Sequence, residues 1–184
     1  MTTIYSRLNA TGYEIINTVH GYHDDQVFRD LYGPSRKHDW KPILVKRDHP
    51  TRRGRCKEAD IPYDHDVLIL RPHAVEALQD ILEAHGEVLP LATNDGVELY
   101  VFNPRFVVDA LDMERSEIER IPESTRFLIR KFVFIHELIR DIDIFRLPYS
   151  YRKPNFSDRF VERVKKAKLK GTEFIKLWSS ETAD

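Results

Sequence analysis

The chain contains little cysteine and no long apolar run. Cys56 is its single thiol, so an internal disulfide, a zinc site built from cysteines and an iron–sulfur cluster held by this chain alone are excluded. No stretch is apolar enough to cross a bilayer, and the N-terminus lacks the basic and apolar segments of a secretory signal. We therefore expect a cytoplasmic protein with no membrane partner.

An excess of charge of either sign is also lacking. The 29 Lys and Arg residues balance 30 Asp and Glu residues, which leaves a net charge of -1. Bulk charge therefore selects neither nucleic acid nor an anionic membrane as a partner. The chain does have 41% hydrophobic residues over 184 positions, enough to form a core. A single domain over residues 1–184 is expected.

The first third of the chain is predicted to be irregular. Glycine and proline interrupt it repeatedly between residues 20 and 57, which excludes long helices and central strands there. Short ordered pieces are predicted as a strand over 13–17, a helical turn over 25–32 and a strand over 42–46.

From residue 60 onward the pattern becomes clearer. The apolar run 67–70 predicts a buried strand, and the stripe that follows predicts one helix from Pro72 to a stop at Gly86. A hairpin is predicted from strands at 87–92 and 97–102, and a capping box at Ser116 and Glu119 predicts a helical turn. Further predicted elements are strands at 126–135, 142–147 and 172–178, and a helix at 158–169 with Ser157 as its N-cap and Gly171 as its stop. The fold class is α+β, a mostly antiparallel sheet with two main helices packed on it.

One cluster has the residue types of a metal site. His20, His23, Asp24 and Asp25 place two imidazoles and two carboxylates within six positions, and these groups bind zinc or another divalent metal when they converge. The first alternative function is therefore a metal-dependent enzyme. A solvated polar loop explains the same residues, and the favoured interpretation below needs no cofactor.

The densest basic segment is the loop at residues 46–57. Its cations could contact phosphates, which gives nucleic-acid binding as a second alternative; the arginines are Arg47, Arg52, Arg53 and Arg55. An ordinary exposed loop has the same composition. The balanced net charge disfavours nucleic acid as a partner.

A loop bounded by Pro148 and Pro154 has the residue types of a protein contact. Tyr149, Tyr151 and Arg152 are large, rigid or multivalent side chains that dominate many interfaces. We predict that they contact a partner, with a second group formed by Tyr22, Asp24, Asp25 and Trp40.

Several short segments of the C-terminal half occur in an order that resembles a known family. They are 110–112 (Ala-Leu-Asp), 141–148 (Asp-Ile-Asp-Ile-Phe-Arg-Leu-Pro), 156–160 (Phe-Ser-Asp-Arg-Phe), 169–174 (Leu-Lys-Gly-Thr-Glu-Phe) and Trp178. This succession is similar to immunity protein family eleven of bacterial polymorphic-toxin systems. With residues 59–62 (Ala-Asp-Ile-Pro), the resemblance extends over 59–178 and leaves 1–58 unassigned.

The resemblance implies a small protein that neutralises a cognate toxin by binding it and occluding its active site. It implies no catalytic residues, so the favoured interpretation is a protein that is not an enzyme. The identity of the toxin and the oligomeric state are left open.

Overall fold

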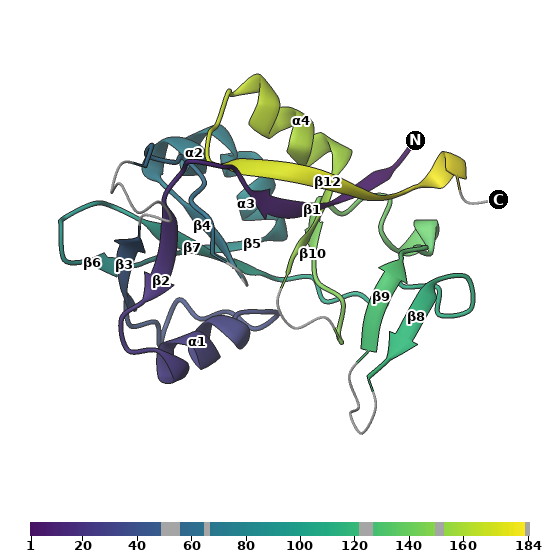
Figure 1. Cartoon of the computed structure of the whole chain (residues 1–184), viewed down its shortest axis with the longest axis horizontal. Coiled ribbons are helices and arrows are strands. Elements are labelled where there is room, and N and C mark those ends of the chain that lie inside the picture. The colour runs from purple at the N-terminus through teal and green to yellow at the C-terminus, as the bar shows by residue number, and fades with distance from the viewer. Residues whose placement is uncertain (49–55, 65–66, 122–126, 150–152, 183–184) are drawn as a thin grey trace.

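The computed structural model describes residues 1–48, 56–64, 67–121, 127–149 and 153–182. It confirms an α+β fold with mostly antiparallel strands (Figure 1). Within the described residues, no helix is both long and apolar enough to cross a membrane.

A four-stranded sheet runs in the order β10-β11-β1-β12. Its strands are β1 (Thr3–Asn9), β10 (Ile144–Phe145), β11 (Asn155–Ser157) and β12 (Thr172–Ser179). The N-terminal strand β1 therefore lies between two strands from the C-terminal end, antiparallel to both, as Figure 1 shows for β12. Strand β12 matches the prediction for 172–178, whereas β1 was not predicted.

Buried side chains attach β1 to the rest of the molecule. Ile4 is fully buried in a cluster with Phe134, Phe145 and Trp178. Arg7 is also buried and donates to the carbonyl oxygens of Pro62 (3.1 Å) and Val67 (2.5 Å). Burial lowers the pKa of Arg7 to about 10, which leaves the guanidinium charged at neutral pH.

Two three-stranded sheets form the other half of the molecule, in the orders β4-β7-β5 and β2-β3-β6. The first contains β4 (Leu68–Leu70), β5 (Gly86–Pro90) and β7 (Tyr100–Pro104); the second contains β2 (Ile15–Thr18), β3 (Leu44–Asp48) and β6 (Ala92–Thr93). β5 and β7 form the predicted antiparallel hairpin, although β6 leaves it to pair in parallel with β3.

The apolar run at β4 is explained by cores on both faces of its sheet. Leu68 and Leu70 belong to a cluster under the helices, whereas Ile69, between them, belongs to a second cluster with Phe28 and Val45. Because successive side chains on a strand point to opposite faces, a strand buried on both faces needs apolar residues at every position. The prediction of a buried strand is confirmed.

The helices are α1 (Tyr22–Arg29), α2 (Pro72–Ala77), α3 (Gln79–His85) and α4 (Asp158–Lys166). The prediction of one continuous helix from Pro72 to Gly86 is wrong, because the backbone breaks at Leu78 between α2 and α3. Ser157 caps α4 as predicted, since its hydroxyl accepts a hydrogen bond from the Phe160 backbone N–H. Short 3-10 turns lie at His136–Leu138 and Ser180–Thr182.

A separate two-stranded ribbon is formed by β8 (Glu117–Arg120) and β9 (Phe127–Lys131). The predicted helical turn after Ser116 is therefore wrong. The Ser116 hydroxyl accepts from the Val133 N–H and donates to the Val133 carbonyl, which fixes the chain in an extended course instead of capping a helix.

Gly171 also differs from its predicted role. The helix before it ends at Lys166, and Lys168 takes a positive φ of 54° after that end. Gly171 has a φ of +99°, and a Cβ built on it would lie 2.2 Å from the Ala59 Cβ. The absence of a side chain at Gly171 is therefore required by close packing against residue 59.

Candidate functional site

A hollow of about 370 Å³ lies beside α1 and the chain that leads into β3. We call it the Trp40 hollow. Its lining mixes apolar side chains with charged and imidazole ones; the lining residues are His20, His23, Asp24, Val27, Arg36, Asp39, Trp40, Lys41, Pro42, Ile43 and Leu44. The structure thus brings together Asp24 and Trp40, two of the residues predicted to contact a partner.

Trp40 is held in place by the strand beside it. Its indole N–H donates to the Pro90 carbonyl oxygen at 2.7 Å. The segment that carries Trp40 is attached at its other end to Glu87, which accepts hydrogen bonds from the Ser35 hydroxyl (2.8 Å) and the Arg36 backbone N–H (2.5 Å). One wall of the hollow is therefore fixed by contacts within the chain.

The Glu87 carboxylate is stabilised in its charged form. Burial raises the pKa of Glu87, but hydrogen bonds from Arg36, Asn103 and Ser35 outweigh burial and hold the pKa below its ordinary value. The Asn103 side chain also donates to the Pro34 carbonyl oxygen at 3.0 Å. Glu87 and Asn103 together fasten the segment to β5 and β7.

Asp24 is the buried charge of the hollow. It lies in the first turn of α1 and is 8% exposed. Its Oδ1 atom is 3.4 Å from the Nδ1 atom of His23, whose side chain is 86% exposed. Its Oδ2 atom is buried and has no hydrogen-bond partner, which is unusual because buried polar atoms are nearly always paired.

The four residues of the metal alternative do not converge. His20, His23 and Asp24 line the Trp40 hollow, whereas Asp25 accepts a hydrogen bond from the Thr18 hydroxyl at 2.7 Å. In the described parts of the chain, no three His, Cys, Asp or Glu side chains are grouped as metal ligands would be. The geometry gives this alternative no support.

Tyr149 contacts other residues of the same chain. Its hydroxyl donates to Asp109 at 3.0 Å, and its ring packs against Phe127. Burial, followed by the contact with Asp109, raises the pKa of the Tyr149 phenol well above its ordinary value. Tyr151, Arg152 and the side chain of Tyr22 lie outside the described part of the chain, so their contact roles stay predictions.

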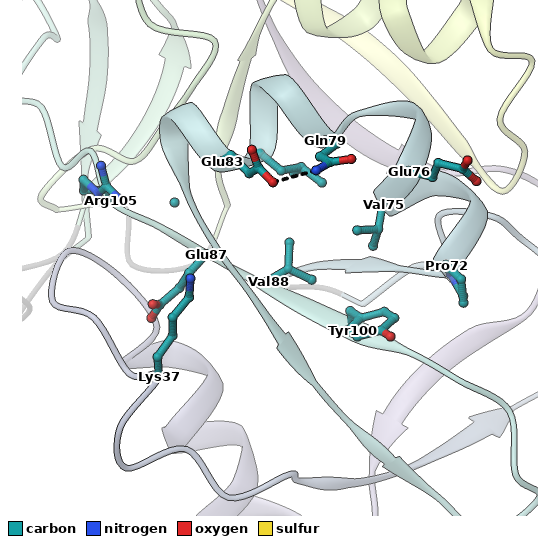
Figure 2. A pocket seen from close by; sticks show the side chains of 12 residues that line it. Lys37, Pro72, Val75, Glu76, Gln79, Glu83, Glu87, Val88, Tyr100 and Arg105 are labelled. Carbon is teal, nitrogen blue, oxygen red and sulfur yellow. Dashed lines mark hydrogen bonds between the residues drawn. The ribbon is translucent and has the colours of Figure 1, made fainter.

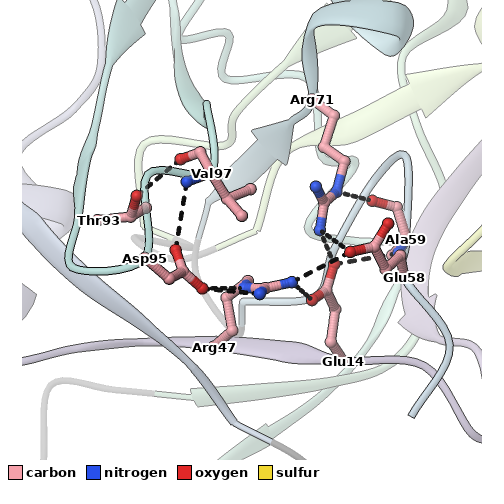
Figure 3. A network of polar contacts seen from close by, with 8 residues as sticks. All are labelled: Glu14, Arg47, Glu58, Ala59, Arg71, Thr93, Asp95 and Val97. Carbon is pink, nitrogen blue, oxygen red and sulfur yellow. Dashed lines mark hydrogen bonds and ion pairs between the residues drawn. The ribbon is translucent and has the colours of Figure 1, made fainter.

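The basic segment is partly drawn into a network of ion pairs (Figure 3). Arg47 contacts Glu14 at 3.2 Å and Asp95 at 2.7 Å, and Arg71 contacts Glu14 at 2.6 Å. The hydrogen bond from Arg47 holds the pKa of Asp95 below its ordinary value. Arg47 is thus occupied by structural contacts. Residues 49–55, with Arg52, Arg53 and Arg55, lie outside the described residues.

A larger groove of about 590 Å³ lies between α2, α3 and the β5–β7 pair. Figure 2 shows Val75 and Val88 near its centre and charged side chains around it. Gln79 and Glu83 are hydrogen-bonded to each other at 2.8 Å, and Glu87 is bonded to the Trp40 segment as described above. Its charged groups are dispersed and do not form a catalytic arrangement.

A buried polar cluster that the sequence did not reveal joins α3 to the start of α4. His85 donates from Nδ1 to the Ile81 carbonyl oxygen, and its Nε2 accepts from the Asp143 backbone N–H at 2.9 Å. Asp143 in turn accepts from the Ser157 hydroxyl and pairs with Arg159. These are the residue types of a catalytic triad, but the serine bonds to the aspartate instead of the histidine, which leaves the serine without a base.

The sequence also gave no indication that Arg36, Asp39 and Lys41 line the same hollow as Asp24. They lie in an irregular segment, where the direction of a side chain cannot be derived from periodicity. The one local feature that could have marked this wall is Pro42, which restricts the backbone of the preceding residue, Lys41.

The comparisons with known proteins concern the C-terminal half. No curated protein matches the sequence. A family model does match, from the start of β6 into β12, and the matched residues contain the segments at 110–112, 141–148, 156–160 and 169–174. The earlier segment at 59–62 lies before the match. The resemblance predicted from the sequence is therefore confirmed over residues 92–178, which match the immunity protein family (Imm11).

Proposed function

We propose that this protein is an immunity protein that binds a cognate toxin and blocks the toxin's active site. The observation that carries the proposal is the family match over residues 92–178. A protein with this function needs a stable frame and a complementary surface, but it needs no reacting groups of its own. We infer that it acts by binding and without a cofactor.

The arrangement of polar side chains supports binding as the mode of action. His85, Asp143 and Ser157 bond to each other or to backbone atoms in the interior. Glu14 and Arg71 form an ion pair that is also internal. These groups, which would be candidates for acid–base chemistry, instead hold the frame together.

The features of the Trp40 hollow support its assignment as the binding surface. Interfaces of about 1,600 Å² commonly depend on a few anchors in desolvated pockets, with Trp, Tyr and Arg prominent among them. The hollow has an immobilised indole, an apolar lining and charged groups of both signs. We propose that Asp24 and Trp40 contact the toxin. Tyr22 and Asp25, which belong to the first turn of α1 together with Asp24, are proposed as further contacts. Tyr149, Tyr151 and Arg152 are proposed as a second contact region.

Co-expression with a toxin tests this function. The toxin domain encoded in the adjacent reading frame is expressed alone and together with this chain. We expect growth arrest in the first case, restored growth in the second, and a stable complex on co-purification. Continued arrest without a complex would contradict the function. Rescue without a stable complex would contradict occlusion as the mechanism.

A further inference from the structure

We propose that the Trp40 hollow binds the guanidinium group of an arginine side chain presented by the partner. This inference rests on the proposed function, since it names the chemistry of the toxin surface that the hollow receives. The first observation is Asp24, whose side chain is 11% exposed; the residue lines the hollow, and its Oδ2 atom is buried and unpaired.

An unpaired buried carboxylate oxygen costs free energy that a hydrogen-bond donor would recover. Because Oδ2 has almost no accessible surface, the Asp24 carboxylate must turn toward the hollow to meet a donor from a partner. Within the free protein the contacts to Asp24 are weak. His23 is 3.4 Å from Oδ1 and is mostly exposed, and a donor at that distance forms at most a weak hydrogen bond. A cationic donor from a partner would give a stronger, charge-assisted bond.

The cations of the chain that line the hollow must also be considered. Arg36 and Lys41 contribute to its walls, and the Arg36 guanidinium is 3.4 Å from Asp39. Arg36 is also fixed at its backbone by Glu87. Asp39 pairs with Arg36, so Lys41 is the second cation of the lining, and the buried Oδ2 atom of Asp24 lacks a donor.

The apolar lining favours a guanidinium over an ammonium. The guanidinium is planar and weakly hydrated, and it stacks on aromatic faces while its N–H groups bond to a carboxylate. Trp40 provides an aromatic ring that is held by its bond to Pro90, and Asp24 provides the carboxylate. A volume of about 370 Å³ has room for one long side chain and part of its backbone.

A titration tests the inference without the toxin. The chain contains two tryptophans, so a spectrum of the ¹⁵N-labelled protein shows two indole N–H signals, which Trp40→Phe assigns. Nα-acetyl-arginine methylamide is added to the full-length protein, and its uncharged citrulline analogue is added in parallel. We expect a saturable shift of the Trp40 signal with the arginine compound, at about millimolar concentration, and at least a tenfold weaker response with the citrulline compound.

Two variants locate the site. Asp24→Asn should abolish the response, because it removes the charge that pairs with the guanidinium. Asp30→Asn makes the same change at the opposite end of α1, on an exposed residue outside the hollow, and should respond like the wild type. The Trp178 signal reports whether each variant is folded. Should Asp24→Asn not fold, the comparison of the arginine and citrulline compounds on the wild type decides alone.

The absence of a saturable shift, or equal shifts with both compounds, would overturn the inference. An unchanged response in folded Asp24→Asn would do the same. These outcomes are separate from the proposed function: a protein that protects against its toxin without binding the arginine compound loses this inference only. A protein that binds the compound but protects against no toxin keeps the site and loses the function.

Discussion

Two regions of the molecule differ in how they relate to the family model and to the Trp40 hollow. In residues 92–178, which match the family, buried polar groups such as Asp143 and Ser157 bond to each other and cap α4. In residues 1–58, Asp24 is buried beside an open hollow with one oxygen unpaired. The family match therefore covers the cluster around Asp143, whereas α1 and Trp40, beside the hollow, lie in the part of the chain that the family model does not match.

Residues 1–58 also form part of the folded core. Strand β1 lies in the middle of the four-stranded sheet, and Glu14 bonds to Arg71 and to the Ala59 backbone N–H. The region that offers the hollow thus also completes the core. The following variants test how far the two regions depend on each other, from the largest expected effect to the smallest.

Glu14→Ala should have the largest effect on stability. The Glu14 side chain is 1% exposed and accepts from Arg47 and Arg71. Its removal leaves two cations without their buried partner, which we expect to cost about 3–5 kcal/mol of unfolding free energy. Chemical denaturation measures the loss. Glu58→Ala, which removes an exposed member of the same network, is the control; equal losses in the two variants would contradict a structural role for Glu14.

Ile4→Ala tests the central position of β1. Ile4 is fully buried, so we expect a loss of about 3 kcal/mol from apolar burial and the cavity that remains. Leu8 on the same strand is 40% exposed, and Leu8→Ala should cost less than about 1 kcal/mol. Thermal unfolding compares the two. Similar small losses would mean that the frame does not need β1.

Ser157→Ala tests the buried polar cluster of the family-matched region. The variant removes the N-cap of α4 and a hydrogen bond to Asp143, and we expect a loss of about 1–2 kcal/mol. Ser6→Ala, at a half-buried serine on β1, should have almost no effect in the same denaturation experiment. A neutral Ser157→Ala would show that the cluster does not stabilise the helix.

Acid should loosen the attachment of the Trp40 segment. Because the folded pKa of Glu87 lies below its ordinary value of 4.5, its contribution is complete above pH 4.5 and is lost as the pH falls through the folded pKa. In a titration from about pH 6 to about pH 3, the chemical shift of the Trp40 indole N–H should therefore change at acidic pH. Glu87→Gln should remove that transition; a transition unchanged in the variant would assign it to another group.

The parts of the fold that could be predicted were those determined by residues close together in the sequence. The capping serine at 157, the apolar run at β4 and the turn at 93–96 are local signals, and the structure confirms each. Strand β1 was missed because its side chains include Thr3, Ser6 and Arg7 and its partners are more than 140 residues away. Sequence alone cannot show that a mixed polar strand will be buried by such distant partners.

The candidate site was predictable only as a set of residue types. Asp24 and Trp40 were selected for their chemistry, and the structure places both at one hollow. The unpaired oxygen of Asp24 and the bond from Trp40 to Pro90 depend on long-range packing. The contacts of Tyr149 with Asp109 and Phe127 were likewise not predictable from its residue type, and its role as a contact residue stays a prediction.

Toxin protection by Trp40→Ala tests the central claim most directly. Cells expressing the toxin domain receive the wild type, Trp40→Ala, or Leu128→Ala, which alters an exposed apolar residue on β9 outside the hollow. Growth and the affinity of the purified complex are measured for each folded protein. The account predicts that Trp40→Ala weakens the complex by about 2 kcal/mol or more and loses protection, while Leu128→Ala protects fully. Full protection by Trp40→Ala with unchanged affinity would contradict it.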